Sequence, residues 1–333
     1  MRRRIAVPAF LVCLVVGVTA GASAGGMDLG SGPLQGRIAF DHPYLDRDGT
    51  AYGYSVFVVD ADGGTARNVM PGGRGFGARW SPDGRRLAFL RSGGVWVVNG
   101  DGSGERLLAR VQAPAFPIWS PDGRRIAFQV GDRTGLKTRL AVVNTDGSGF
   151  RTLANADASA MWPNGEPSWS PDGDWIAFRR GGAIRVVQVD GSEQRLVSRC
   201  VGRACLDPHW SPDGRWLLFT GYEGIVIVEH PTTANRKERL LVRNATDQSW
   251  SPDGRTIVFV RDGTIQIMNA NGSNRRRLTK GHNPIWSPDG KALAFVRYGG
   301  PKDASTIYTV QIDGTSERLL THDAWVSFPD WGR

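Results

Sequence analysis

The chain has 333 residues, 40% of them apolar, which excludes both a disordered tail and a miniprotein held together by disulfides. Its 44 Gly and 19 Pro residues exceed ordinary usage and call for many turns. The net charge is +9, but the basic residues occur singly, without a basic stripe interleaved with aromatic residues, so nucleic-acid binding is not expected.

The N-terminal segment, residues 1–24, has the three parts of a secretory signal peptide. Three Arg residues precede an apolar stretch, Ile5–Ala20, and Ala22-Ser23-Ala24 forms an A-x-A cleavage site. We predict cleavage after Ala24, a periplasmic or secreted protein, and no membrane span once the signal is removed. An uncleaved anchor is the less favoured alternative, because 16 apolar residues interrupted by Pro and Gly fall short of the roughly 20 that a spanning helix needs.

A repeated pentapeptide, Trp-Ser-Pro-Asp-Gly, occurs six times, and a truncated copy, Trp-Gly, follows at Trp331. The complete copies begin at Trp80, Trp119, Trp169, Trp210, Trp250 and Trp286. Their spacing of 36 to 50 residues is typical of propeller blades with four strands, and it exceeds the period of ankyrin and tetratricopeptide repeats. Runs of β-branched and aromatic residues between Gly, Pro, Asp and Asn predict strands rather than helices.

One copy of the repeat shows how each blade is expected to fold. A first strand ends at Trp80, residues 81–84 turn the chain, and Arg86–Leu90 forms the second strand. Third and fourth strands are predicted at Val95–Asn99 and Arg106–Leu108, joined by an Asp-Gly hairpin turn. Pro presets φ at the second position of the first turn and Gly suits its fourth, so the Asp of each turn is expected to be structural rather than catalytic.

The second strand of the repeat occurs seven times, beginning with Ile38-Ala39-Phe40, which no Trp segment precedes. The last Trp segment, Ser327–Trp331, has no strand after it. These two ends complement each other if the C-terminal segment is the innermost strand of the first blade, which closes the ring. We therefore predict an all-β fold: a single seven-bladed β-propeller over residues 36–333, with four antiparallel strands per blade, preceded by an N-terminal extension at residues 25–35.

The repeats resemble those of TolB-type β-propellers, which are related to WD-repeat (WD40-like) blades. The resemblance rests on the six pentapeptides, each followed by a strand such as Leu87-Ala88-Phe89, and it covers residues 36–331. It implies a propeller that works in the periplasm or outside the cell. TolB itself carries an α/β domain before a six-bladed ring, and residues 25–35 are too few for such a domain.

Two cysteines remain after the predicted signal, Cys200 and Cys205, with Val-Gly-Arg-Ala between them. In an oxidising compartment such a pair is expected to form a disulfide. A metal site that adds His209 is the alternative, but three ligands in one tight loop without a fourth make a poor site.

The sequence contains no Gly-x-Ser-x-Gly elbow, no His-Glu-x-x-His and no phosphate-binding Gly loop, and no cofactor is predicted. We expect a monomeric binding module for a protein or peptide partner. The alternative is a metal-dependent, lyase-like enzyme that acts on a carbohydrate or another small substrate. His209, His282 and His322 each lie in a connection that leads into a new blade, so they are expected on one face near the central channel. Resemblance to propeller lyases implies that several His could hold a metal there.

The two faces of the predicted propeller differ in sequence. The repeated turns lie together on one face, whereas the other face carries irregular segments, including residues 41–53, 154–166 and 298–305. Loops longer than a hairpin requires are where binding residues usually lie, so the partner is expected on the irregular face. The candidate binding residues are His42, Tyr44, Arg47, Tyr52, Trp162, Tyr298 and Lys302.

Overall fold

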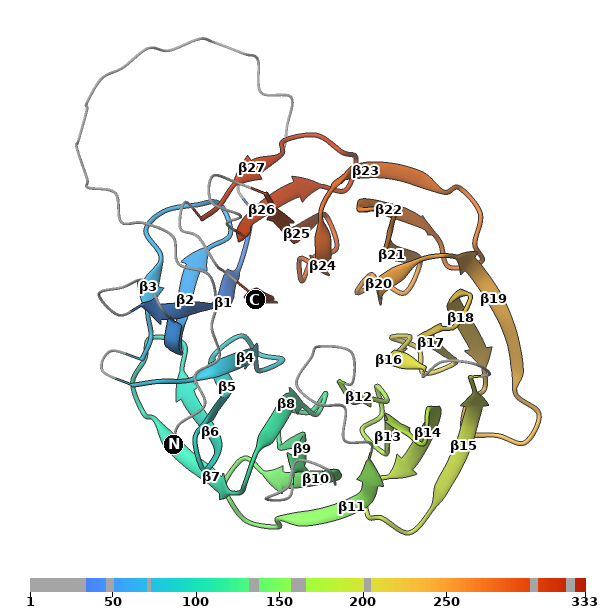
Figure 1. The fold of residues 1–333 in the computed structure, drawn as a ribbon, viewed down its shortest axis with the longest axis horizontal. Helices are drawn as coiled ribbons and strands as arrows, with labels where there is room; N and C mark the ends of the chain where they lie inside the picture. The colour runs from blue at the N-terminus through green and yellow to red at the C-terminus, as the bar shows by residue number, and fades with distance from the viewer. Residues whose placement is uncertain are drawn as a thin grey trace, which may run out of the picture.

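The computed structural model describes residues 34–45, 51–70, 73–131, 138–156, 166–200, 205–299, 305–321 and 327–333. They form seven sheets of four antiparallel strands arranged in a ring, so the prediction of a seven-bladed β-propeller is confirmed (Figure 1). We call the central space that the innermost strands surround the channel. No helix with the length and apolarity needed to span a membrane occurs in this part of the chain.

The first four blades contain these strands, from the channel outward. Blade 1 contains β28 (Ser327–Gly332), β1 (Arg37–Leu45), β2 (Ala51–Asp60) and β3 (Arg67–Asn68). Blade 2 contains β4 (Phe76–Trp80), β5 (Arg86–Arg91), β6 (Gly94–Asn99) and β7 (Arg106–Arg110). Blade 3 contains β8 (Pro114–Trp119), β9 (Arg125–Gly131), β10 (Thr138–Asn144) and β11 (Arg151–Ala156). Blade 4 contains β12 (Ser168–Trp169), β13 (Trp175–Arg180), β14 (Ala183–Gln188) and β15 (Gln194–Arg199).

The last three blades repeat the same order. Blade 5 contains β16 (Leu206–Trp210), β17 (Trp216–Gly221), β18 (Gly224–Glu229) and β19 (Lys237–Arg243). Blade 6 contains β20 (Thr246–Trp250), β21 (Thr256–Arg261), β22 (Thr264–Asn269) and β23 (Arg276–Lys280). Blade 7 contains β24 (His282–Trp286), β25 (Ala292–Tyr298), β26 (Ser305–Gln311) and β27 (Arg318–Leu319).

The repeated pentapeptide forms the same turn in six blades, as blade 2 illustrates. The Ser81 hydroxyl accepts a hydrogen bond from Arg86 N at 2.9 Å and donates one to the Asp83 carboxylate. The hydrogen bond from Ser81 lowers the pKa of Asp83, and Gly84 has a φ of 65° that favours glycine. The turn Asp therefore caps a hairpin, as the sequence predicts.

The core lies between neighbouring blades, where a buried Phe in each second strand packs against the sheet of the preceding blade. Six of these Phe side chains are fully buried: Phe89, Phe128, Phe178, Phe219, Phe259 and Phe295. In the first three blades an Arg at or near the start of the second strand also stacks on the Trp of the following blade. The guanidinium of Arg37, for example, lies 4.7 Å from the Trp80 ring and donates to Gly84 O at 2.9 Å.

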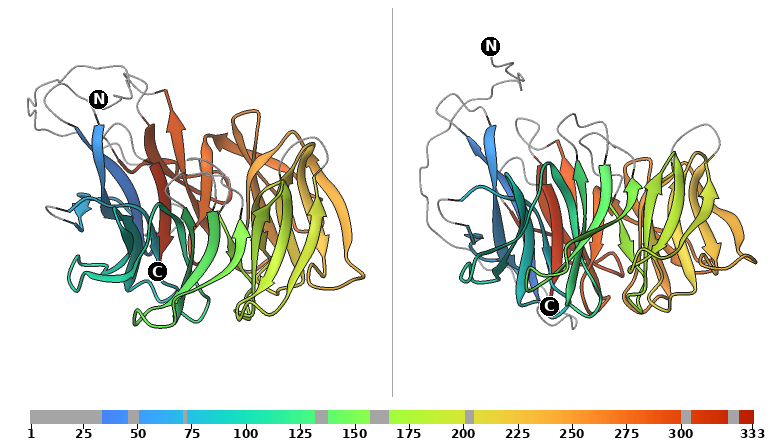
Figure 2. Two further views of the ribbon diagram at one scale, coloured as in Figure 1. Left: turned by 60° about the horizontal axis from the view of Figure 1, so that its bottom comes forward. Right: turned by 90° about the horizontal axis from the view of Figure 1, so that it is seen from below.

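The ring is closed by its two ends, as predicted. β28 pairs antiparallel with β1, with Trp331 opposite Ile38, so the C-terminal strand completes the blade formed by the N-terminal strands. The Trp331 side chain is buried, and its indole donates to Gln35 O at 3.0 Å. The C-terminal Arg333 lies beside Gly84, on the face that carries the Ser-Pro-Asp-Gly turns (Figure 2). We call the face with the Ser-Pro-Asp-Gly turns the turn face and the other the loop face.

Candidate functional site in the central channel

The innermost strands share a β-bulge that shapes the channel wall. In blades 2, 3, 5, 6 and 7 the innermost strand shifts its pairing with the second strand. The shift lies just before the residue that precedes the Trp of the repeated pentapeptide, which is Trp286 in blade 7. The residue three positions before each Trp has a φ between 49° and 65° in these blades. Left-handed backbone is costly for residues other than glycine and is concentrated at functional sites. The same geometry in five blades makes this position a defined place for side chains near the loop face.

The position of each residue relative to the Trp of its innermost strand therefore defines two rings of residues around the channel. The mouth ring contains the residues three positions before each Trp: Gly77, Phe116, Glu166, Asp207, Asp247, Asn283 and Phe328, the side chain of Phe328 lying outside the described part. The deep ring contains the residues immediately before each Trp: Arg79, Ile118, Ser168, His209, Ser249, Ile285 and Asp330. Because each innermost strand runs from the loop face to the turn face, the mouth ring lies nearer the loop face.

Three consecutive blades supply a carboxylate each to the mouth ring: Glu166, Asp207 and Asp247 in blades 4, 5 and 6. We call these three residues the acidic sector. Burial raises the pKa of Asp207 well above its usual range, and repulsion from Glu166 and Asp247 raises it further, against the opposing effect of Arg179. The three carboxylates are thus close enough to influence one another, and a cation placed among them would relieve that repulsion.

An ion pair crosses the channel between blades that are not neighbours. Arg79 of blade 2 donates to the Glu166 carboxylate of blade 4, although blade 3 lies between these two blades in the ring (Figure 1). Burial alone would lower the pKa of Arg79, but Glu166, Asp330 and Asp41 together raise it. Mouth-ring and deep-ring side chains therefore project into the channel and interact across it.

Two further carboxylates surround Arg79. Asp41 is 1% exposed, and its Oδ2 accepts a hydrogen bond from Gly77 N at 2.7 Å. Its Oδ1 has no hydrogen-bond partner, and burial raises the pKa of Asp41 to about 7 despite the nearby Arg79. Asp330 accepts from Trp80 N at 2.6 Å, and burial raises its pKa as well. Carboxylates thus outnumber guanidinium groups around the described part of the channel.

Hydrogen bonds between neighbouring blades hold the acidic sector in place. The amide of Gln248 donates to Asp207 O at 2.8 Å and accepts from the Thr220 hydroxyl at 2.7 Å. The Asp247 carboxylate accepts from Asn283 N at 3.1 Å. A preorganised site costs less to order when a ligand binds, so these contacts favour recognition by the acidic sector.

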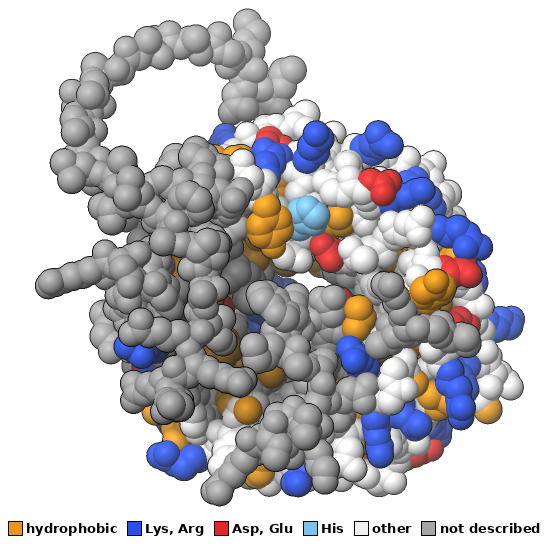
Figure 3. All heavy atoms as spheres, in the orientation of Figure 1, with side chains coloured by type: hydrophobic (Ala, Val, Ile, Leu, Met, Phe, Trp, Pro, Cys, Tyr) orange, Lys and Arg blue, Asp and Glu red, His pale blue; other side chains and the backbone are white. Residues whose placement is uncertain are grey.

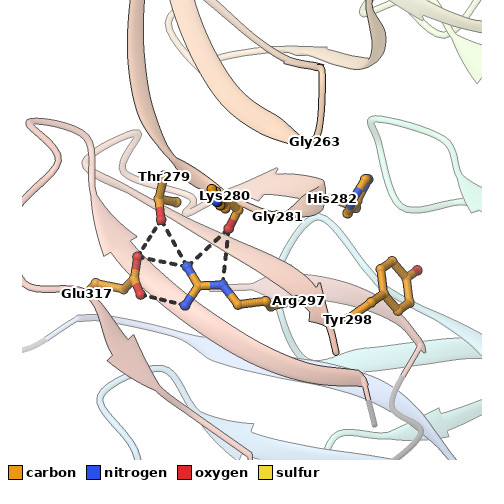
Figure 4. Close-up of a pocket in the computed structure, with 8 residues that line it drawn as sticks. All are labelled: Gly263, Thr279, Lys280, Gly281, His282, Arg297, Tyr298 and Glu317. Carbon is orange, nitrogen blue, oxygen red and sulfur yellow. Dashed lines mark hydrogen bonds and ion pairs between the residues drawn. The ribbon is translucent and has the colours of Figure 1, made fainter. Parts of the chain in front are cut away.

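A cavity of about 550 Å³ opens on the loop face beside the acidic sector, between blades 6 and 7. Figure 4 shows Arg297 bonded to Glu317, Thr279 and Lys280 O at one end, with His282 and Tyr298 at the other. The His282 and Tyr298 rings are 5.4 Å apart, and Tyr298 is 57% exposed. Burial and the Asp247 charge raise the pKa of Tyr298, so this ring lies close to the acidic sector. In Figure 3, Lys and Arg side chains follow the outer rim of this face over blades 5 and 6.

The predicted binding residues are only partly covered by the described structure. Tyr298 lines the cavity between blades 6 and 7. Tyr44 donates to Gly73 O at 3.2 Å, and the His42 ring lies 5.2 Å from Phe57, so both pack within blade 1 and its neighbouring loop. The predictions for the remaining side chains lie outside the described residues: Arg47, Tyr52, Trp162 and Lys302.

Two of the three candidate metal-binding histidines are described. His209 belongs to the deep ring, where burial lowers its pKa, and it lines a cavity toward the turn face. His282 lines the cavity on the loop face, and His322 lies outside the described residues. Within the described residues, no group of three or more His, Cys, Asp or Glu side chains has a geometry that could hold a metal ion.

The two cysteines lie in blade 4 and the connection to blade 5. Cys200 and Cys205 are joined by a disulfide in the structure, with their Cα atoms 5.5 Å apart. Cys205 is fully buried and packs with Trp210 and Leu217. The bond thus ties the entry of blade 5 to the outer strand of blade 4.

Comparison with known proteins agrees with this architecture. The TolB beta propeller domain family matches residues 32–282 and again residues 163–333, so the chain belongs to this family. No curated protein matches the chain.

Several solved structures are similar in fold. The crystal structure of TolB from Acinetobacter baumannii is 16% identical, with a TM-score of 0.56 over 89% of this chain and 82% of that one. An oligogalacturonate lyase in complex with manganese is 17% identical, with a TM-score of 0.63 over 77% of this chain and 82% of that one. An oligogalacturonate lyase from Vibrio parahaemolyticus is 16% identical, with a TM-score of 0.61 over 78% and 87% of the two chains. At these identities the similarity establishes the fold alone.

Sequence reasoning missed the acidic sector, although a signal for it is present. Aligned on the repeated Trp, the third residue upstream reads Gly, Phe, Glu, Asp, Asp, Asn and Phe around the ring. Three acidic residues in consecutive repeats at one position, outside the pentapeptide, could have pointed to a charged wall. The bulge that makes this position line the channel leaves no comparable pattern in the sequence.

Proposed function

We propose that the protein is an exported binding module whose central channel, at the loop face, receives a cationic side chain of a protein or peptide partner. The observation that carries this proposal is the acidic sector, in which Glu166, Asp207 and Asp247 come from three consecutive blades. Burial, together with the charges of Glu166 and Asp247, raises the pKa of Asp207, so the three groups lie close together. A Lys or Arg side chain would pair with these carboxylates by charge-assisted hydrogen bonds. Export in this proposal rests on the signal-like residues 1–24.

The surroundings of the acidic sector support a peptide rather than a free ion. Tyr298, exposed and next to His282, provides an aromatic platform at the rim of the sector. Exposed Tyr side chains are enriched among residues that dominate binding energy. The cavity of about 550 Å³ beside them offers room for residues that flank the cationic side chain.

Partner capture tests the proposal. The mature chain, immobilised, is exposed to an envelope extract, and retained proteins are compared between wild type and Asp207→Asn/Asp247→Asn. We expect the double variant to lose most of the retained partner, because it replaces two of the three carboxyl groups of the acidic sector by amides of nearly the same size. A matched control, Glu223→Gln/Asp262→Asn, removes two charges from loops of blades 5 and 6 on the same face, outside both rings. Equal capture by both double variants would contradict the proposal.

The metal-dependent alternative receives less support, because His209 and His282 line different cavities in the described structure. Metal analysis of the purified mature protein decides it. Stoichiometric metal, together with a melting temperature that falls in chelator, would favour the enzyme; neither is expected of the binding module.

A further inference from the structure

The outer wall of blades 5 and 6 concentrates basic side chains. Their outermost strands, β19 and β23, meet where Arg275, which precedes β23, donates to Leu241 O of β19 at 3.3 Å (Figure 1). Residues 236–243 and 275–280 together carry eight basic side chains and a single acidic one, Glu238. All eight are exposed: Arg236, Lys237, Arg239, Arg243, Arg275, Arg276, Arg277 and Lys280. The sequence predicts no basic stripe interleaved with aromatic residues, but the fold places these two segments in neighbouring blades.

Strand pairing shows which basic side chains of β19 face blade 6. Residues that lie opposite each other in a sheet project from the same face. Ile227 packs in the apolar core between blades 5 and 6, and its partner in β19 is Arg239, so Arg239 projects toward blade 6. Successive side chains of a strand alternate between its faces, so Lys237, two positions earlier, projects the same way.

The same reasoning identifies the basic side chains of blade 6 that face blade 5. Phe259 packs in the core between these blades, and its partner Gln266 is in turn opposite Arg277, so Arg277 projects toward blade 5. Arg275 also lies on this side, because it bonds to Leu241 O and its guanidinium is 5.8 Å from the Phe259 ring. Four cations thus face one boundary between blades. We call this set the basic seam: Lys237, Arg239, Arg275 and Arg277.

The charges of the basic seam are not paired. The side chains of Lys237, Arg239 and Arg277 form no hydrogen bond or ion pair with the described residues. Arg275 donates to a carbonyl group, which carries no net charge, and its guanidinium retains further N–H donors. Four like charges therefore project toward one another, and an anion bound between them would relieve their repulsion.

Two acidic residues of blade 5 lie close to the basic seam, and both are engaged elsewhere. The Glu238 carboxylate accepts a hydrogen bond from the Ser198 hydroxyl of blade 4 at 3.0 Å, on the side away from blade 6. The Glu229 carboxylate accepts from Arg215 at 2.7 Å. That hydrogen bond lowers the pKa of Glu229, to which the charge of Lys237 adds a smaller effect. A ligand of the basic seam must therefore bring its own negative charge.

The distribution of these cations restricts the ligand. They are spread along two strands, and the seven residues of β19 alone extend roughly 23 Å. A short anion would meet only one or two of them at a time, and salt screens such pairs. Guanidinium groups bind oxyanions through two parallel hydrogen bonds, so three Arg residues favour a chain with repeated oxyanions. The unpaired backbone groups at the outer edges of β19 and β23 can also bond hydroxyl groups.

Two other kinds of polyanion match this surface poorly. Neither β19 nor β23 contains an aromatic residue on which a nucleic-acid base could stack. A flat bilayer cannot follow the convex wall of a seven-bladed ring, and neither strand has an exposed apolar side chain to insert (Figure 1). We propose that the basic seam binds a linear anionic polysaccharide, independently of the acidic sector in the channel.

Dextran sulfate tests this proposal, with neutral dextran as the uncharged polymer of the same backbone. Calorimetric titration of the mature chain in about 150 mM salt should show binding of dextran sulfate alone. Lys237→Gln/Arg239→Gln/Arg275→Gln/Arg277→Gln should weaken it about tenfold or more, because four exposed ion pairs each contribute modestly. The matched control replaces four exposed cations that follow the turns of the turn face and should bind like wild type: Arg85→Gln/Arg124→Gln/Arg255→Gln/Lys291→Gln.

A smaller change separates loss of binding from loss of structure. Lys237→Gln/Arg239→Gln alters two exposed residues of one strand, so it should keep the wild-type melting temperature and weaken binding about threefold. Asp207→Asn/Asp247→Asn should bind dextran sulfate like wild type, so the two sites can fail separately.

Three results would overturn the proposal. Equal weakening by the two fourfold variants would show that only net charge matters. Tighter binding of oligothymidylate than of dextran sulfate, lost in the basic-seam variant, would make the ligand a nucleic acid. The same result with vesicles of phosphatidylglycerol and phosphatidylcholine would make it a membrane.

Discussion

Deletion of Ser327–Arg333 is expected to destabilise the whole propeller, by at least about 4 kcal/mol, which corresponds to a fall in melting temperature of about 10 °C or more. The segment forms β28, whose Trp331 packs in one cluster with Ile38 and Phe40. Its loss would remove a buried indole, expose the edge of β1 and uncover one side of blade 2. Thermal unfolding of the truncated and full-length mature chains measures the effect.

A control for this deletion comes from the outer edge of the ring. Leu319→Ser changes an exposed residue of the outermost strand of blade 7 and is expected to alter stability by no more than about 0.5 kcal/mol. If the truncated chain melts at the same temperature as the full-length chain, the C-terminal strand does not close the ring.

Replacement of Asp41 by Asn is expected to change how stability depends on pH. The pKa of Asp41 is raised from 3.8 to about 7 in the folded protein, so between these values the folded state holds a proton that the unfolded state has lost. Stability from this group is therefore present at low pH and decreases as pH rises through about 7, by up to about 4 kcal/mol in total. Asp41→Asn cannot ionise and keeps an acceptor for Gly77 N, so its advantage over wild type should be largest near pH 8, smaller near pH 5 and absent near pH 3.5.

Denaturant unfolding across this pH range measures the difference between the two proteins. Asp330 and Asp207, whose pKa values are also raised, remain in both, so some loss of stability with rising pH should persist in the variant. Asp62→Asn, at an exposed turn position, is the control and should run parallel to wild type. Parallel curves for Asp41→Asn and wild type would show that Asp41 is not buried beside Arg79.

The architecture could be predicted because the residues that form each turn lie within a single repeat. Trp-Ser-Pro-Asp-Gly encodes a turn whose hydroxyl, carboxylate and glycine all act locally, and the unmatched ends at Ile38 and Trp331 reveal the closure. These features depend on residues near one another in sequence. The number of blades and the pairing of the C-terminal strand therefore follow from counting and from the rule that sheet edges are covered.

The candidate sites depend on contacts that no repeat encodes by itself. Arg79 and Glu166 are 87 positions apart and meet only because the ring brings blades 2 and 4 to opposite sides of blade 3. The Trp210 indole lacks the hydrogen bond to the preceding blade that its counterparts Trp169 and Trp250 make, a difference that the shared pentapeptide does not predict. Sequence reasoning selected long loops and their aromatic residues, whereas the charged groups lie on the regular inner strands.

The central claim is that the acidic sector binds a cationic side chain. Isothermal titration calorimetry of the mature chain with capped trilysine tests it most directly, and capped triglutamate serves as the control peptide of opposite charge. Wild type should bind trilysine and not triglutamate, with affinity that weakens in salt. The affinity should also strengthen as pH rises, because the Asp207 carboxyl, whose pKa is raised, then ionises. Asp207→Asn/Asp247→Asn should bind at least about tenfold more weakly, while Glu223→Gln/Asp262→Asn should bind like wild type. Equal affinity of wild type and Asp207→Asn/Asp247→Asn for trilysine would contradict the assignment of the acidic sector as the binding site.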